Sequence, residues 1–305
     1  MMAFREIPLV DISGLGDTDP ARHAKTVEDI RKAASQVGFL YVSGHGIPAE
    51  TIARLRAATE AFFARPQDEK MKVYIGNSRN HRGYVPEGEE VFYGGSKDKK
   101  EAFDLSIDLP ADDPDYVSGN PLLGPNQWPE DMPEFHDAVS AYYDAIFALG
   151  HRLLHGFAEA LGLEPTALDE YFAKPPSQLR LIHYPYDPPP VEGAFVVNIG
   201  DMLEVWSNGV FTATSHRVRK VQEERYSFPL FFSCDYWTKV EPLPAFVSAD
   251  RPAAYPPVIA GEHLHAQTVQ TFTYLKERLA RGEIDMPEGS LGLSSFGREA
   301  RVRGT

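Results

Sequence analysis

The stretch that decides the fold reads GAFVVNIGD at residues 193–201, and it is followed by SHRV at 215–218 and RYS at 225–227. Each run predicts a β-strand, and the first of them ends at a Gly-Asp turn. The second strand presents His216, and Arg225 follows nine residues later. An imidazole suits Fe(II), while a guanidinium can bind a carboxylate through two parallel hydrogen bonds. Ser227 shares a strand face with Arg225, so the pattern indicates a metal site beside an anion site.

The composition is that of a globular protein. The chain has 305 residues, of which 43% are hydrophobic and 24% charged, enough for one large domain or two small ones. Its net charge of −14 disfavours nucleic acid and anionic membranes as partners, because an acidic surface repels phosphate groups. The single cysteine, Cys234, excludes an internal disulfide and suits a reducing compartment. Since no signal-like segment follows Met1 and no apolar run reaches about 20 residues, we expect a cytoplasmic protein.

The N-terminal half has mainly helical patterns, and the C-terminal half is rich in strand patterns. Helices are predicted at residues 24–37, 49–64, 139–161 and 265–279. Strands are predicted at residues 7–12, 39–42, 103–109, 179–184, 194–199, 211–218 and 226–233. Residues 77–95 are Gly-rich and polar, which predicts a surface loop. The order favours an α+β chain with one region at residues 1–135 and a second at residues 136–305.

Several longer motifs resemble one family of enzymes. They are IPLVDIS (7–13), GFLYVSGHGIP (38–48), KEAFDLSIDLP (100–110), GAFVVNIGDMLEVWSNGVFTATSHRV (193–218) and RYSFPLFF (225–232). Over most of the chain, the sequence resembles the isopenicillin N synthase-like family of Fe(II)/2-oxoglutarate-dependent oxygenases. The resemblance implies a double-stranded β-helix (jelly-roll) core, with a helical N-terminal region and a C-terminal helix.

The same resemblance implies roles for individual residues. His216 would be the distal iron ligand, and Arg225 and Ser227 would bind the C5 carboxylate of 2-oxoglutarate. Tyr184, in LRLIHYPY, matches a family tyrosine near the same co-substrate. The expected cofactors are Fe(II) and 2-oxoglutarate, with ascorbate as an accessory reductant. The expected reaction oxidises a small-molecule substrate with O2 while 2-oxoglutarate is decarboxylated to succinate, although an oxidase or an ethylene-forming variant fits the same residues.

One part of the family pattern is missing. Two of the three iron ligands in this family come as His-x-Asp, on a strand between the HYPY run and the GAFVVNIGD run. Here Pro190 is followed almost at once by Gly193, and none of the ten histidines has Asp or Glu two positions later. We therefore expect a truncated jelly roll and impaired catalysis, since a single imidazole holds Fe(II) weakly. A deletion, a mis-assembled gene model and a degenerate paralogue all fit this gap.

Three residues near the gap could replace the missing ligands: His183, Asp187 and Glu192. His183 is adjacent to Tyr184 on a predicted strand, so the two side chains should face opposite ways. If Tyr184 faces the co-substrate, His183 does not, and rescue of the iron site is not expected. The rival function is therefore a non-catalytic protein that binds a carboxylate metabolite or a protein partner.

Ordinary structural roles compete with these assignments. His216 could be a packing histidine, Arg225 could pair with a neighbouring glutamate, and Tyr184 could be a packing tyrosine. The Arg-x-Ser spacing after His216 favours the binding roles. Two histidine pairs are assigned to a helix face (His151 and His155) and to the surface or a helix cap (His263 and His265). An acidic run with tyrosines is assigned to a solvated loop, with a substrate-facing lip as the alternative (Glu87, Glu89 and Glu90 with Tyr84 and Tyr93).

Overall fold

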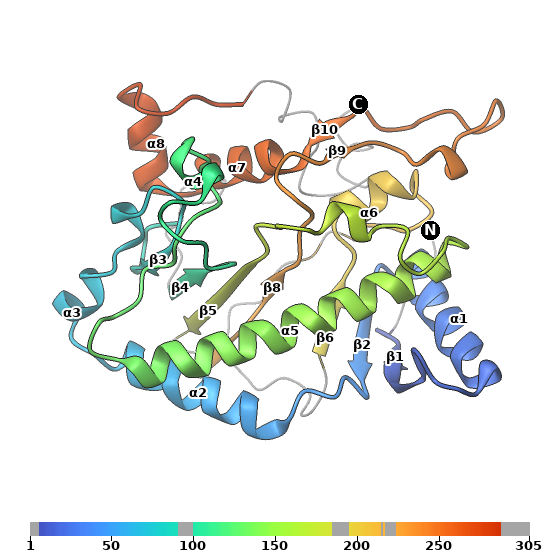
Figure 1. The fold of residues 1–305 in the computed structure, drawn as a ribbon, viewed down its shortest axis with the longest axis horizontal. Helices are drawn as coiled ribbons and strands as arrows, with labels where there is room; N and C mark the ends of the chain where they lie inside the picture. The colour runs from blue at the N-terminus through green and yellow to red at the C-terminus, as the bar shows by residue number, and fades with distance from the viewer. Residues whose placement is uncertain (1–5, 91–99, 185–194, 215, 217–223, 288–305) are drawn as a thin grey trace.

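The computed structural model describes residues 6–90, 100–184, 195–214, 216 and 224–287. Within these residues the chain is a mixed α+β protein, in agreement with the predicted class (Figure 1). The described strands form a three-stranded, a five-stranded and a two-stranded sheet. Figure 1 shows the long helix α5 (Pro133–Ala160) crossing the molecule in front of the strands.

The smaller of the two main sheets begins near the N-terminus. Its order is β1-β2-β6, and its strands are β1 (Leu9–Asp11), β2 (Phe39–Ser43) and β6 (Phe195–Asn198). β1 and β2 run parallel, and α1 (Pro20–Gln36) makes the crossover between them. Gly38 turns the chain from helix to strand with a φ of +75°, and an added Cβ would lie 2.3 Å from the carbonyl oxygen of Thr212. This position therefore requires glycine.

The larger sheet is antiparallel throughout its described part. Its order is β3-β4-β5-β7, with β8 also paired to β5, and its strands are β3 (Gly83–Val85), β4 (Glu101–Leu105), β5 (Gln178–Tyr184), β7 (Arg225–Ser227) and β8 (Leu230–Phe231). Asp104 lies opposite Arg180, and Arg225 lies opposite Tyr184. Since strand side chains alternate, this register assigns each residue to one of two faces.

One face of the larger sheet packs on α2 (Ala49–Phe63) and α5, and we call it the α5 face. Its residues are Glu101, Phe103, Leu105, Leu179, Leu181, His183 and Tyr226. The apolar ones join the largest hydrophobic cluster, together with Phe62 of α2 and Val139 of α5. The helix predicted at 139–161 is confirmed, because its apolar residues at three- and four-residue spacing form one buried side.

The opposite face packs on α7 (Ala260–Thr271) and α8 (Thr273–Ala280), and we call it the α7 face. Its residues are Ala102, Asp104, Arg180, Ile182, Tyr184, Arg225 and Ser227. Ala102 and Ile182 share a hydrophobic cluster with Val269 and Phe272. The predicted co-substrate residues therefore all lie on the α7 face.

The remaining elements are short. They are α3 (Gln67–Met71), α4 (Pro114–Val117), α6 (Asp201–Trp206), the antiparallel pair β9 (Lys239–Val240) and β10 (Val258–Ile259), and 3-10 turns at Ile12–Gly14, Ile75–Asn77, Asp169–Tyr171 and Pro244–Phe246. Among the described residues, no helix combines the length and apolar character needed to cross a membrane.

The strand predicted at residues 211–218 is not formed in its described part. The backbone N–H of Phe211 donates to Ser207 Oγ at 3.0 Å. The backbone N–H of Ala213 donates to Glu204 Oε2 at 2.7 Å. Side chains from the end of α6 accept the hydrogen bonds that a neighbouring strand would otherwise accept, so no ladder develops.

Two segments predicted to be at the surface contain buried side chains instead. The loop predicted at 77–95 contains β3, and its described residues include buried polar side chains (Asn80, His81, Arg82 and Glu90). His263 and His265 are buried in α7. Local polarity was misleading because the partners of these residues come from distant parts of the chain.

Candidate functional site

Arg225, Ser227 and Tyr184 lie together on the α7 face. Arg225 is directly opposite Tyr184, and Ser227 is opposite Ile182. The guanidinium carbon of Arg225 stands 5.9 Å from the centre of the Tyr184 ring, a cation–π distance. All three residues are partly buried. The structure thus brings together the three residues predicted to bind the co-substrate.

His216 lies at the other sheet. Its ring packs edge-to-face on Phe39 of β2, with 5.1 Å between ring centres, and the residue is exposed. Its Nδ1 lies 3.0 Å from the carbonyl oxygen of Thr214. A proton on Nδ1 makes that hydrogen bond and leaves the lone pair on Nε2, the tautomer that a metal ligand needs.

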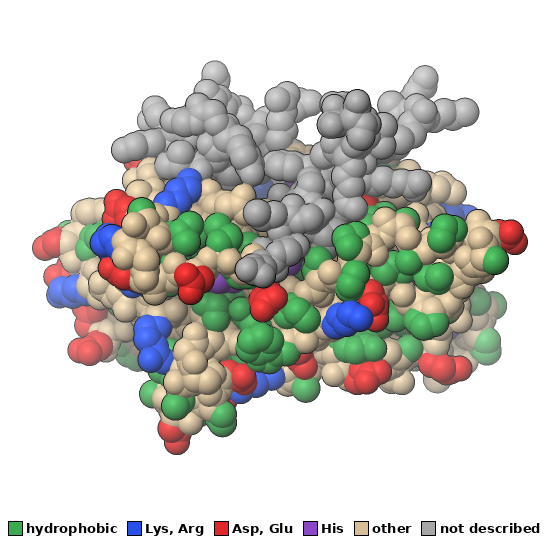
Figure 2. Space-filling view, turned by 90° about the horizontal axis from the view of Figure 1, so that it is seen from above, with side chains coloured by type: hydrophobic (Ala, Val, Ile, Leu, Met, Phe, Trp, Pro, Cys, Tyr) green, Lys and Arg blue, Asp and Glu red, His purple; other side chains and the backbone are tan. Residues whose placement is uncertain are grey.

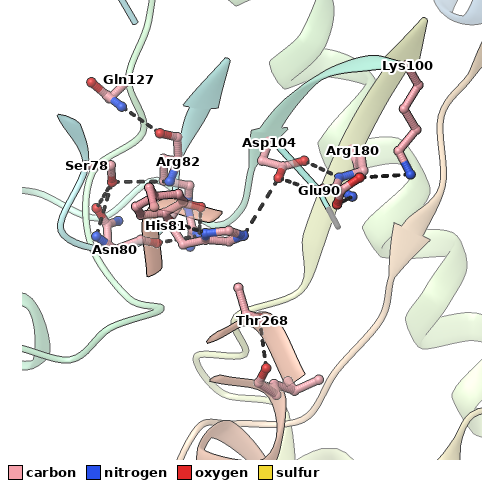
Figure 3. A network of polar contacts seen from close by, with 12 residues as sticks. Ser78, Asn80, His81, Arg82, Glu90, Lys100, Asp104, Gln127, Arg180 and Thr268 are labelled. Carbon is pink, nitrogen blue, oxygen red and sulfur yellow. Dashed lines mark hydrogen bonds and ion pairs between the residues drawn. The ribbon is translucent and has the colours of Figure 1, made fainter. Parts of the chain in front are cut away.

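A buried ionic network occupies the α7 face beside β4 (Figure 3). Arg180 donates from Nε and Nη2 to the two oxygens of Asp104, at 2.6 and 2.7 Å. Its Nη1 donates to one oxygen of Glu90 at 2.5 Å, and Lys100 Nζ lies 2.8 Å from the other. Asp104 is wholly buried and Glu90 is 3% exposed. Two acids and two bases neutralise one another here, which offsets much of the cost of their burial.

His81 extends this network toward α8. Its Nδ1 lies 2.6 Å from the hydroxyl of Tyr274. Burial, assisted by the charge of Arg180, holds the pKa of His81 well below its ordinary value. Burial alone would raise the pKa of Glu90, but its cationic partners lower it below the ordinary value. At neutral pH the imidazole is therefore uncharged and the carboxyl group ionised.

Two family models match the chain. The model described as non-haem dioxygenase in morphine synthesis N-terminal matches residues 7–131, and the model of the 2OG-Fe(II) oxygenase superfamily matches residues 182–234. A 2-oxoglutarate-dependent dioxygenase of Aspergillus niger is 30% identical, in an alignment that covers 75% of this chain and 85% of that protein. The chain belongs to the 2-oxoglutarate/Fe(II) oxygenase family. Its relatives also include a homoarginine-6-hydroxylase of Arabidopsis thaliana, 30% identical over 89% of this chain and 90% of that protein.

Solved structures of 2-oxoglutarate/Fe(II) oxygenases share the fold. A 2OG-Fe(II) oxygenase family protein of Caulobacter crescentus superimposes with a TM-score of 0.74, at 25% identity, over 90% of this chain and 99% of that one. A rice dioxygenase for auxin oxidation gives 0.67 at 23% identity, over 91% of this chain and 96% of that one. These oxygenases have a jelly-roll core, so the predicted fold class is confirmed.

The cofactors of the family are Fe(II) and 2-oxoglutarate, and the described residues fit them unequally. A guanidinium, a hydroxyl and an aromatic ring on one sheet face suit the carboxylate of 2-oxoglutarate. For iron, the described part of the chain offers no group of three or more His, Cys, Asp or Glu side chains that could hold a metal ion. The described residues therefore fit the co-substrate and do not fit the metal.

His183 is not available as a replacement iron ligand. Its Nδ1 lies 2.9 Å from Glu101 Oε1 and its Nε2 lies 3.0 Å from Glu224 Oε1, so both ring nitrogens are engaged. It lies on the α5 face, away from Tyr184, as predicted. The other two candidates, Asp187 and Glu192, lie outside the described residues.

Sequence reasoning missed the buried network on the α7 face. Arg180 precedes Tyr184 by four residues on the same strand, so the alternation of side chains already assigned the two to one face. This alternation was the signal in the sequence that could have placed Arg180 near the candidate site. Asp104 and Glu90 gave none, because they lie 76 and 90 residues from their partner in the sequence.

Proposed function

We propose that this chain binds 2-oxoglutarate through Arg225 and Ser227 and that its iron site is incomplete, so that oxygenase activity is impaired. The observation that carries the proposal is the shared position of Arg225, Ser227 and Tyr184 on the α7 face, in a region that lacks a complete set of metal ligands among its described residues. The guanidinium supplies a two-bond fork for the C5 carboxylate, and the hydroxyl adds a third donor. The Tyr184 ring beside the guanidinium restricts its orientation.

An absent internal segment accounts for the incomplete iron site. No His-x-Asp or His-x-Glu occurs anywhere in the sequence. The alignment with the Aspergillus niger relative extends over 278 positions, although it takes in 75% of this 305-residue chain. The relative therefore has residues inside the aligned region for which this chain has no counterpart. These observations support a truncated jelly roll in which His216 is the remaining iron ligand.

In an intact oxygenase of this family, Fe(II) supplies the activation of O2 for oxidation of the substrate. A single imidazole does not give the ligand number and geometry that retain Fe(II). As an enzyme, the chain would act on a small molecule in the cytoplasm, with ascorbate as an accessory reductant. The second candidate function is non-catalytic binding of a carboxylate metabolite or a protein partner, and the misfit of the described residues to iron favours it.

Nucleic acid and membranes are not among the proposed partners. The net charge is −14. On the face shown in Figure 2, the described Lys and Arg side chains are scattered among acidic ones rather than gathered in a patch. Polyanions need a concentrated positive surface, so this distribution disfavours them as partners of this face.

Anaerobic titration of the folded chain with Fe(II) and 2-oxoglutarate tests the iron site. We expect no visible charge-transfer band, because one predicted ligand cannot hold the metal beside the co-substrate. His216→Ala is the control and should give the same blank spectrum. A band in the wild-type chain that His216→Ala abolishes would show that other ligands complete the site, and the proposal of impaired catalysis would be wrong.

Calorimetric titration with 2-oxoglutarate tests whether Arg225 binds its carboxylate, a role for which we call this residue the Arg225 anchor. We expect Arg225→Ala to weaken binding by about 10- to 100-fold, the value of a charge-assisted fork to a carboxylate. Arg56→Ala is the matched control, because Arg56 is an exposed arginine on α2 whose Nε donates to Glu60 at 2.8 Å. Equal affinities of the wild type and Arg225→Ala would refute the carboxylate site.

A further inference from the structure

His183 is held between two carboxylates on the α5 face of the larger sheet. Glu101 of β4 accepts at 2.9 Å from one ring nitrogen, and Glu224 accepts at 3.0 Å from the other. A neutral imidazole has one N–H, whereas the imidazolium has two and can donate to both carboxylates together. The two hydrogen bonds of His183 can therefore be donated together only by the charged ring.

The two contacts of His183 on the β7 side flank Arg225 in the chain. Glu224 precedes Arg225, and the ring of Tyr226, which follows it, stacks on His183 with 4.7 Å between centres and 11° between planes. Arg225 itself points to the opposite face, beside Tyr184. Because β7 has three residues, its position depends on such side-chain contacts as well as on its few backbone hydrogen bonds.

Other side chains near His183 hold the carboxylate of Glu101 in place. Its Oε2 accepts from Lys70 Nζ of α3 at 2.6 Å and from the hydroxyl of Tyr84 at 2.6 Å. Lys70 is itself buried and also donates to a backbone carbonyl of α2. Glu101 is therefore anchored from three directions, whereas the side chain of Glu224 is 63% exposed and has contacts with His183 at 3.0 Å and with the hydroxyl of Tyr226 at 3.4 Å.

Solvent reaches His183 through a cavity. A cavity of about 370 Å³ opens beside His183, and the titratable or charged residues that line it with His183 are Lys70, Tyr84, Glu87, Lys100 and Glu101. The His183 side chain is 16% exposed, so its proton can exchange with water. On the α2 side it meets the ring of Phe63 at 5.5 Å, an uncharged neighbour.

We propose that His183 is a positioning residue for the Arg225 anchor: by joining Glu224 to Glu101 and stacking on Tyr226, it sets where the Arg225 guanidinium lies. This inference rests on the proposed binding of 2-oxoglutarate at Arg225. It assigns a role to a residue on the face opposite to the co-substrate, and it makes the geometry of the anchor depend on the charge of one imidazole.

The direction of the pH dependence follows from the partners. The hydrogen bond to Glu101, with the one to Glu224, raises the pKa of His183 above its ordinary value of 6.5, although burial opposes the rise. Charged His183 therefore makes both hydrogen bonds, to Glu101 and to Glu224, below pH 6.5. One of them is lost as the pH rises through the raised pKa of His183. Affinity for 2-oxoglutarate should fall over the same interval, because the co-substrate carboxylates stay ionised throughout.

The test measures 2-oxoglutarate affinity between about pH 6 and about pH 8.5. We expect the wild-type dissociation constant to rise about two- to fivefold, since the pair with Glu224 is partly exposed. His183→Gln and Glu224→Gln should bind at the weaker level and lose the pH dependence. His23→Gln is the matched control, because His23 of α1 lies 2.6 Å from Glu159 of α5 in a similar His–carboxylate pair that does not involve β7.

Hydrogen exchange of the β7 amides gives a second readout that does not need the ligand. Protection of residues 225–227 should fall in His183→Gln and should stay unchanged in His23→Gln. If His183→Gln leaves both the pH dependence and the β7 protection as in the wild type, the positioning role is wrong, even when Arg225→Ala abolishes binding. If Arg225→Ala binds normally, the proposed function fails, and the exchange data still decide whether His183 fixes β7.

Discussion

Arg180 carries a positive charge inside a strand that is covered on both faces. A buried cation without partners costs several kcal/mol. Arg180 avoids this cost with the fork to Asp104, the bond to Glu90 and the ring of Phe272, whose centre is 5.3 Å from its guanidinium carbon. Burial would lower the pKa of Arg180, but the two carboxylates raise it. The side chain therefore stays charged, and these partners stabilise its charge.

Removing Asp104 should show how far the stability of the protein depends on the partners of Arg180. Asp104→Ala leaves Arg180 with half of its countercharge in a dry site, and we expect a loss of about 3–5 kcal/mol in the free energy of unfolding, measured with urea. Glu28→Ala is the control, because Glu28 accepts a similar fork from Arg31, at 2.7 Å for both bonds, but the Arg31 side chain is 50% exposed. The control should lose less than about 1 kcal/mol. Comparable losses in the two variants would contradict the account of Arg180.

At the scale of elements, the C-terminal helical pattern breaks at Phe272. The backbone there is extended, with φ −88° and ψ 132°, and α8 begins at the next residue. Glu89 supplies the start of α8: its carbonyl accepts from the N–H of Thr273 at 3.0 Å, and its Oε1 accepts from the N–H of Tyr274 at 2.9 Å. The single helix predicted at 265–279 is therefore wrong. Periodicity could not reveal a cap that lies 185 positions from the helix it serves.

The Glu89 cap gives a test of how α8 is held. Glu89→Ala removes the side-chain acceptor for the N–H of Tyr274, together with the contact to the Tyr74 hydroxyl at 3.1 Å, and the lost cap alone costs about 1 kcal/mol. Tryptic cleavage at Lys276 and Arg278 should then be about fivefold faster, because cleavage follows the population of the open helix. Glu87→Ala, at an exposed position in the same loop, should cleave at the wild-type rate. Equal rates in the two variants would argue against the cap.

At the scale of the molecule, one hydrophobic cluster joins residues from both sides of the boundary predicted at 135/136. Val10 and Phe62 lie before that boundary and Val139 and Phe211 lie after it, and all four belong to this cluster. The division into two regions stays a prediction. The cluster extends along α5, which packs against both α1 and α2.

Spacing along the chain predicted some of this architecture and could not predict the rest. The buried side of α5 follows from a periodicity that the sequence displays directly. The Arg-x-Ser pair and Tyr184 meet on one face because strand alternation is a local property. The order β3-β4-β5-β7 joins residues 83–105 to residues 178–227, and no local pattern encodes such a pairing. The burial of Glu90 follows from that long-range pairing, so its acidic neighbourhood suggested a solvated loop.

The side chains on the two faces of β5 have different roles. Leu179 and Leu181 fill the core, whereas Tyr184 lies beside Arg225 on the face of the proposed ligand. In evolutionary terms, selection for folding and selection for chemistry act on separate side chains of one strand. A lineage can therefore lose its reaction without losing its fold, and its gene can persist as long as binding alone is useful to the cell.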